Sequence, residues 1–342
     1  MIKIKNIAKL IEFLQKDFAV FAPIKDGKAT AFGQIQNVDE ICNAVLNTKK
    51  SPKNVFFPQA EVMFQYDENE VKTLTKNDKP IAIWGIRSCD VKSLRLMDKV
   101  FGNAHQQPKN KMYHDPYWKE KYDNSLIIGM ACNEPSSTCF CHNFDDGPFS
   151  EKGSDIFAFD CKDYFVLKGV SEKGKKVLAK FKGEEFTETN QIEKLQKIAE
   201  SYLPEKQDIS KIKEKLDKIW HDPIWDEIAR KCINCGACAF VCPSCHCFDV
   251  SDEGKGKKGQ RIRIWDSCMF SIFTHEASGH NPRGLSTQRV RQRIMHKLNY
   301  FIDNYGEHLC TGCGRCVMVC PTNMDIREIV KKVINHKIED KK

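Results

Sequence analysis

The stretch Cys232-Ile-Asn-Cys235-Gly-Ala-Cys238-Ala-Phe-Val-Cys242-Pro243 decides how this chain of 342 residues is organised, and residues 310–321 repeat its spacing. Both stretches read C-x2-C-x2-C-x3-C-P. Three thiolates on one tight loop can surround a centre of several metal ions, and small residues let backbone N–H groups approach its inorganic sulfurs. The proline after the fourth cysteine has no N–H to donate and turns the chain away. The repeat therefore predicts two polynuclear metal centres.

This spacing is the one with which bacterial ferredoxins bind [4Fe–4S] clusters, where the fourth cysteine of each motif ligates the other cluster. We therefore assign one cluster to the first motif and the other to the second, with the fourth cysteines exchanged. The two ligand sets are Cys232, Cys235, Cys238 and Cys320, and Cys310, Cys313, Cys316 and Cys242. A pair of zinc knuckles is the alternative, but it needs only two C-x2-C pairs and leaves cysteines of both motifs unexplained.

Four further cysteines follow two apolar runs in the N-terminal half. The runs 80–86 and 125–131 are typical of buried strands, and they lead directly into Cys89 and Cys132. Ligands of open α/β sheets gather where parallel strands end, so two neighbouring strands would bring these cysteines together. Cys139 and Cys141 follow within ten residues. We predict a third [4Fe–4S] site at Cys89, Cys132, Cys139 and Cys141; buried free thiols and a zinc site remain alternatives.

The apolar pattern divides the chain into two domains near residue 206. Residues 1–205 alternate short apolar runs with amphipathic stretches, which predicts an α/β (α+β) domain with a helix at 7–14 and a hairpin at 155–168. Residues 206–342 are predicted to form a mainly helical, ferredoxin-like dicluster domain. It would carry an insertion between the two motifs and an amphipathic helix over 289–305.

Composition and charge exclude several classes of protein. No run approaches 18 uncharged apolar residues, and the N-terminus is a poor secretory signal, so we expect no membrane span. Seventeen cysteines at this spacing favour a reducing, anaerobic cytoplasm.

The net charge of +8 falls to roughly +2 if three clusters of about −2 each are bound, so nucleic acid is not an expected partner. The basic residues between the motifs indicate a solvated face, or else a docking surface for an acidic partner. They are Lys255, Lys257, Lys258, Arg261, Arg263, Arg283, Arg289, Arg291 and Arg293.

Five cysteines lie outside the predicted sites, and two of them, Cys42 and Cys161, have no evident partner in the sequence. Cys245, Cys247 and Cys268 read as buried thiols near the clusters, with a metal site or a redox-active thiol group as alternatives. The chain has no G-x-G-x-x-G after a strand, no P-loop and no H-E-x-x-H. This combination favours a chain that moves electrons and leaves substrate chemistry to its partners. An enzyme that reduces a disulfide or sulfur substrate at the three cysteines is the alternative function.

The motifs, taken in order, resemble one family. Its more specific stretches are Gly85-Ile-Arg-Ser-Cys89-Asp90, Cys139-Phe-Cys141, Trp265-Asp-Ser-Cys268 and Gly279-His-Asn-Pro-Arg283. With the tandem motifs, they resemble the iron–sulfur electron-transfer subunit of anaerobic sulfite reductase and the beta subunit of soluble NiFe sulfhydrogenases. The resemblance covers nearly the whole chain. It implies an electron-transfer subunit, itself not catalytic, between a flavoprotein that oxidises NAD(P)H with FAD and a catalytic reductase or hydrogenase subunit.

Overall fold

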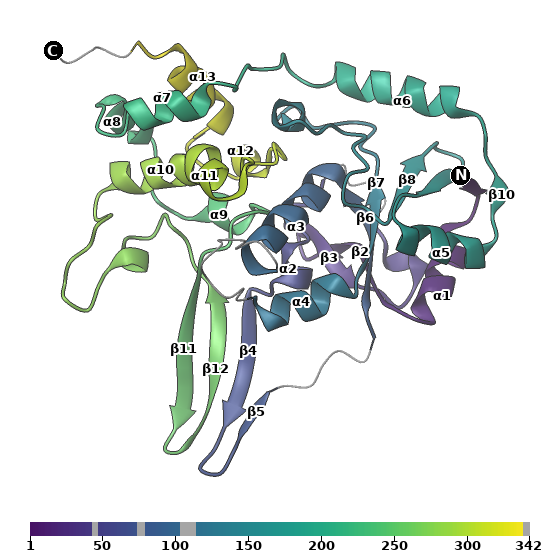
Figure 1. The fold of residues 1–342 in the computed structure, drawn as a ribbon, viewed down its shortest axis with the longest axis horizontal. Helices are drawn as coiled ribbons and strands as arrows, with labels where there is room; N and C mark the ends of the chain where they lie inside the picture. Colours follow the sequence, from purple (N-terminus) through teal and green to yellow (C-terminus); the bar gives the residue numbers. More distant parts are fainter. Residues whose placement is uncertain (43–46, 74–78, 103–113, 338–342) are drawn as a thin grey trace.

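An eight-stranded mixed sheet forms the centre of the N-terminal half in the computed structural model, which describes residues 1–42, 47–73, 79–102 and 114–337 (Figure 1). The strand order is β10-β1-β9-β8-β7-β6-β2-β3. The four adjacent central strands, β8, β7, β6 and β2, are parallel to one another. The strands are β1 (Ile2–Ile4), β2 (Ala19–Asp26), β3 (Ala29–Gln34), β6 (Ile81–Arg87), β7 (Leu126–Met130), β8 (Ile156–Asp160), β9 (Phe165–Gly169) and β10 (Glu184–Glu185).

Helices cover both faces of this sheet, as its continuously apolar central strands require. On one face, α1 (Ile7–Gln15) and α5 (Glu172–Phe181) pack against the sheet through residues such as Leu10 and Leu178. On the other face, α3 (Ser88–Phe101) and α4 (Pro116–Asp123) bury Leu94 and Trp118, together with the short α2 (Lys53–Phe56). The predicted α/β character of the N-terminal half is confirmed, including the helix at 7–14, the parallel pair β6–β7 and the hairpin β8–β9.

The C-terminal half is helical around the two tandem motifs. Helix α6 (Thr189–Ser201) crosses from the large sheet toward this part of the chain (Figure 1). The helices that follow are α7 (Ile212–Lys218), α8 (Ile224–Ala229), α9 (Ala237–Phe240), α10 (Ser286–Met295), α11 (Phe301–Tyr305), α12 (Arg315–Met318) and α13 (Ile326–Asn335). A π-helical turn, His296–Tyr300, joins α10 to α11, so the predicted amphipathic helix is continuous but locally widened. None of the helices in the described ranges is long and apolar enough to cross a membrane.

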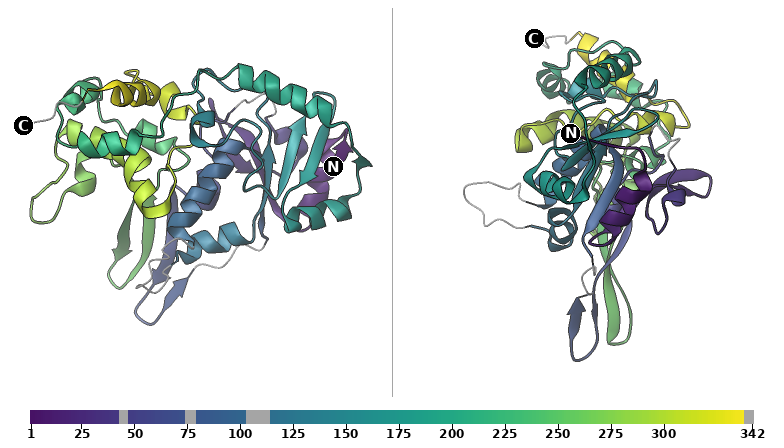
Figure 2. Two further views of the ribbon diagram at one scale, coloured as in Figure 1. Left: turned by 45° about the horizontal axis from the view of Figure 1, so that its top comes forward. Right: turned by 90° about the vertical axis from the view of Figure 1, so that its right-hand side faces the viewer.

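The C-terminal half, which was expected to be mainly helical, also contributes two strands to a second sheet. Strands β11 (Phe248–Lys255) and β12 (Lys258–Trp265) pair with β4 (Ala60–Tyr66) and β5 (Val71–Thr73) in the order β11-β12-β4-β5. This sheet joins the two halves of the chain and projects as an arm from the rest of the molecule (Figures 1 and 2). The sequence pattern missed β11 because that strand is exposed on both faces and lacks a period of two.

The basic residues between the motifs do not form one solvated face. Lys255, Lys257 and Lys258 are exposed at the tip of the β11–β12 hairpin, as that interpretation requires. Arg263, Arg289 and Arg293 instead are buried, which corrects the prediction for these three side chains. Arg263 is held by ion pairs with Glu61 and Asp115.

Candidate iron–sulfur sites

Four cysteines from separate segments line one cavity at the carboxyl ends of β6 and β7; we call this set the N-terminal site. Cys89 lies in the first turn of α3, Cys132 follows β7, and Cys139 and Cys141 lie on the next loop. The four thiols therefore surround one small cavity. The parallel pairing of β6 with β7 brings the first two cysteines together, as the sequence predicted.

Burial makes these thiols hard to ionise in the absence of a bound cation. It raises the pKa of Cys139 and of Cys141 to about 12, and a neighbouring thiol adds to each shift. Burial also raises the pKa of Cys89 well above its ordinary value. Iron ions compensate crowded thiolates with positive charge, and a thiol that binds a metal is deprotonated outright. The donor set therefore fits an iron–sulfur cluster.

We call Cys232, Cys235, Cys238 and Cys320 the first tandem site; these four cysteines line a second small cavity. Cys320, which belongs to the other motif, lies at this cavity with the three loop cysteines. Gly236 has a φ of 73° and begins α9. A Cβ there would lie 2.6 Å from the Phe270 ring, so both the backbone conformation and the space require glycine.

The second tandem site consists of Cys310, Cys313, Cys316 and Cys242. Burial raises the pKa of Cys316 to about 12, and the charges of the other three thiols contribute to the increase. Burial likewise raises the pKa of Cys310 to about 11, with Cys242 and Cys313 among its neighbours. Helices α9 and α12 of the two motifs pack against each other, which keeps the tandem sites adjacent.

The N-terminal site lies directly against the second tandem site. Cys89, Cys141 and Cys313 form one buried cluster. The Phe140 N–H donates to the Gly312 carbonyl oxygen at 2.8 Å, and the Cys139 Sγ lies 3.7 Å from the Cys313 carbonyl oxygen. The three four-cysteine sites thus form a series, with the second tandem site in the middle.

A buried ion pair fastens these two sites together. Arg315, just before the third cysteine of the second motif, donates from Nη1 and Nη2 to the carboxylate of Asp90 at 2.5 and 2.7 Å. Asp90 follows Cys89 in α3, and both charged side chains are essentially inaccessible to solvent. Arg315 Nε also donates to the Thr48 carbonyl oxygen at 2.7 Å. The Arg-Ser-Cys-Asp stretch of the sequence therefore has a structural role beyond its cysteine.

Two buried cations face the tandem sites. The Nε and Nη2 atoms of Arg293 are buried without a hydrogen-bond partner, and its side chain lies near both Cys238 and Cys316. An anionic cluster bound in either tandem site would compensate that charge. Lys297 Nζ lies 3.2 Å from the Cys242 Sγ. A hydrogen bond from Cys245 and the Lys297 charge, against burial, hold the pKa of Cys242 well below its ordinary value.

Of the five cysteines outside the three sites, Cys245, Cys247 and Cys268 lie beside the tandem sites. Cys247 and Cys268 flank the base of the β11–β12 hairpin, where the Asp266 N–H donates to the Cys247 carbonyl oxygen at 2.9 Å. A hydrogen bond with Cys268 lowers the pKa of Cys247 to about 7. Cys245 lies beside Cys242. Across the described ranges, no three His, Cys, Asp or Glu side chains surround a position for a single metal ion.

The family-specific stretches build the surroundings of these cysteines. Trp265 stacks on Phe57 and donates from Nε1 to the Phe57 carbonyl oxygen at 3.0 Å. Lys53 Nζ lies 3.7 Å from the centre of the Trp265 ring and 2.8 Å from the Cys245 carbonyl oxygen. Asn281 donates to the Ser271 carbonyl oxygen at 2.7 Å. The contacts of Trp265 and Lys53 join the N-terminal half to the segment that follows the first motif, whereas that of Asn281 lies within the C-terminal half.

Three basic residues lie at the sites: Arg293 was expected on a solvated or docking face, and no role was predicted for Arg315 and Lys297. A signal was present for two of them, because Arg289, Arg293 and Lys297 recur every four residues beside the apolar stripe of the 286–305 helix. Such spacing places basic side chains at the border of the buried face. For Arg315, its position inside the C-G-R-C loop was the available signal.

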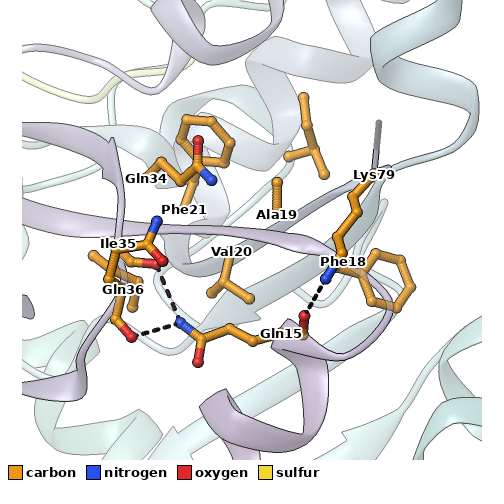
Figure 3. Close-up of a pocket in the computed structure, with 10 residues that line it drawn as sticks. Gln15, Phe18, Ala19, Val20, Phe21, Gln34, Ile35, Gln36 and Lys79 are labelled. Atoms are coloured by element: carbon orange, nitrogen blue, oxygen red, sulfur yellow. Dashed lines mark hydrogen bonds between the residues drawn. The ribbon is translucent and has the colours of Figure 1, made fainter. Parts of the chain in front are cut away.

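A groove at the other end of the large sheet differs in character from the cysteine sites (Figure 3). It lies at the amino ends of β2 and β6, where Gln15 Nε2 donates to the carbonyl oxygens of Ile35 and Gln36 at 3.1 and 3.0 Å. Lys79 Nζ donates to the Gln15 carbonyl oxygen at 2.8 Å. These polar groups satisfy one another, and ligands of parallel sheets bind at the opposite, carboxyl edge.

Comparisons with known proteins agree with this geometry. Residues 231–324 match a family model described as a 4Fe-4S dicluster domain, so the chain contains an iron–sulfur domain at the tandem motifs. The chain is similar to the sulfhydrogenase 2 subunit beta of Pyrococcus furiosus, with 30% identity over 322 residues that cover 92% of each chain. No solved structure matches significantly. The similarity extends through both halves, and the chain therefore belongs to the family of sulfhydrogenase beta subunits.

Proposed function

We propose that this chain relays electrons between a donor, either a flavoprotein that uses FAD and NAD(P)H or a ferredoxin, and a catalytic subunit. The catalytic subunit would belong to an anaerobic reductase or hydrogenase, of the sulfite reductase or NiFe sulfhydrogenase type. The chain itself would be non-catalytic and would work in the reducing cytoplasm. Membership of the sulfhydrogenase beta family supports a place among partner subunits.

The ligand assignment is part of this proposal. Residues 1–205 would form the domain with the N-terminal site, and residues 206–342 the dicluster domain. Three [4Fe–4S] clusters would be held by the N-terminal, first tandem and second tandem sites as defined above. When bound, such clusters supply one-electron carriers. The chain's own residues would set the order of the sites, and the buried Arg293 and Lys297 would compensate negative charge at the tandem sites.

The contact series of three four-cysteine sites is the observation that carries the proposal. A chain that only bound structural metal would need no such contiguity, whereas electron transfer depends on short distances between successive centres. Cys313 is central because it belongs to the middle site and contacts the N-terminal one. Its replacement, Cys313→Ser, should therefore stop electron transfer between the partner subunits.

The experiment uses the complex purified under anaerobic conditions. Cys313→Ser should lower NAD(P)H-linked turnover to near background, while each partner keeps its activity with artificial electron donors or acceptors. Cys161→Ser is a matched control, since Cys161 is buried but belongs to none of the three sites. Unchanged NAD(P)H-linked turnover in Cys313→Ser would contradict the proposal.

The first tandem site is the one that reaches the surface. All seventeen cysteines lie in the described ranges, and only Cys235 among them is exposed. Ile233 and Leu285 beside it are 62% and 66% exposed. Asn234 holds them near each other by donating to the Ser286 Oγ at 2.8 Å. Within the proposed function, this apolar rim is where a partner subunit docks, and Ile233→Asp should weaken assembly of the complex while leaving its iron content unchanged.

A second candidate function is reduction of a disulfide or sulfur substrate at Cys245, Cys247 and Cys268. The interaction between the Cys247 and Cys268 thiols favours it, because a paired dithiol can carry two electrons. The variant Cys247→Ser separates the two functions when its iron and acid-labile sulfide equal those of the unchanged protein. Loss of turnover would then favour the thiol centre, and full turnover would favour a pure relay.

A further inference from the structure

The two exchanged cysteines, Cys242 and Cys320, have closely similar surroundings in the chain. Each is followed by proline and then by a residue with a hydroxyl group, Ser244 or Thr322. The Ser244 Oγ lies 3.4 Å from the Cys242 Sγ, and the Thr322 Oγ1 lies 3.5 Å from the Cys320 Sγ. The neutral hydroxyl contacts are therefore matched, and any other contact on these sulfurs distinguishes the two tandem sites.

Besides a contact from the Cys245 thiol, a lysine supplies the charged contact that distinguishes Cys242 from Cys320. Lys297 Nζ lies 3.2 Å from the Cys242 Sγ, and the lysine is only 3% exposed. The corresponding contact on Cys320 comes from a neutral group, the backbone N–H of Met324 at 3.1 Å. Arg293 does not distinguish the sites, because it lies near cysteines of both. Arg315 is compensated by Asp90.

The fold holds Lys297 in this position. It belongs to the π-helical turn between α10 and α11, and such turns are frequent at functional sites. The Leu309 N–H donates to the Lys297 carbonyl oxygen at 2.9 Å, which fixes the turn beside Cys310. The ammonium group therefore lies between the helix and the sulfur of an opposite loop, where water screens its charge poorly.

Reduction of a cluster adds one negative charge, so a fixed cation next to a ligand sulfur stabilises the reduced form more than the oxidised form. A hydrogen bond from a charged donor is also stronger than one from a neutral donor. We infer that Lys297 is a positioning residue that raises the reduction potential of the second tandem site above that of the first. The inference rests on the proposed function, and it makes the middle of the series the preferred place for an electron.

The test is a redox titration of the anaerobically purified full chain, followed by electron paramagnetic resonance. Signals are assigned to the two tandem sites by their loss in Cys235→Ser and Cys313→Ser. In Lys297→Met, the ratio of reduced to oxidised second tandem cluster at a fixed potential should fall about tenfold, which for a one-electron couple is a shift of about 59 mV. Lys297→Arg, which keeps the charge, should restore most of the ratio.

A control variant distinguishes the loss of a charged contact from the loss of a neutral contact on a ligand sulfur. Thr322→Val removes the neutral hydroxyl contact of Cys320 and should change the potential of the first tandem cluster less than Lys297→Met changes that of the second. Ser244→Ala is a less clean comparison, because the Ser244 hydroxyl also accepts a hydrogen bond from Lys297 Nζ at 3.5 Å. An unchanged titration in Lys297→Met would overturn the inference. The inference would also be overturned if, in the unmodified protein, the first tandem cluster had the higher reduction potential. That measurement does not depend on whether a lysine variant folds. Absence of iron and sulfide would instead contradict the proposed function.

Discussion

The tandem sites and the N-terminal site differ in how the chain assembles them. Each tandem site takes three of its four cysteines from one loop of seven residues. The N-terminal site takes Cys89 from a helix, Cys132 from the end of a strand and two more from a loop, and these come together only when β6 and β7 pair. The spacing of ligands along the chain specifies the first kind of site, whereas the fold specifies the second.

This difference predicts different sensitivities. A tandem loop keeps three ligands together even when distant contacts are lost. The N-terminal site depends on the α/β sheet and on its contact with residues 312–315 of the second motif. Substitutions at that contact should therefore disturb the N-terminal site more than the first tandem site.

The largest effect is expected for Arg315→Met. The substitution leaves the buried Asp90 carboxylate unpaired, which should lower the free energy of unfolding by about 3–5 kcal/mol. Chemical denaturation of the anaerobic protein measures this change. The double variant Asp90→Leu with Arg315→Met is the control, because it removes both charges and should recover much of the stability. A single variant as stable as the unchanged chain would show that the ion pair does not hold the two sites together.

A smaller and more local effect is expected for Cys89→Ser. It removes one ligand of the N-terminal site, so iron should fall from about 12 to about 8 per chain if each cluster has four iron ions. The signals of the tandem sites should persist, because their loops are intact. Cys161→Ser should retain all the iron. If Cys89→Ser also retained it, the N-terminal cysteines would be free thiols.

The smallest effect is expected for Gly314→Ala. Gly314 has a φ of 73°, and a Cβ there would lie 2.5 Å from the Thr138 Oγ1 and 2.7 Å from its carbonyl oxygen, on the loop of the N-terminal site. Gly256→Ala is a matched control with a similar φ of 63° and open space around it. The left-handed conformation costs each variant about 1–2 kcal/mol. Thermal unfolding should show a greater loss for Gly314→Ala, and equal losses would mean that the close contact is unimportant.

Much of this arrangement was predictable from local sequence. The spacing in the tandem motifs predicted which cysteines line the first tandem cavity, Cys320 included, and the two apolar runs predicted the pairing that brings Cys89 to Cys132. The sheet β11-β12-β4-β5 was not predicted, because pairing between strands nearly 200 residues apart leaves no local periodicity. The burial of Arg293 and Lys297 was also missed, because a basic residue is usually solvated and only the fold reveals a partner of opposite charge.

The central claim is that three four-cysteine sites hold iron–sulfur clusters. Iron and acid-labile sulfide, measured on the chain purified under strictly anaerobic conditions, test it most directly. The account predicts about 12 of each per chain, as three cubanes require. Zinc in place of iron and sulfide would contradict it for all three sites, and about 8 of each would contradict it for the N-terminal site.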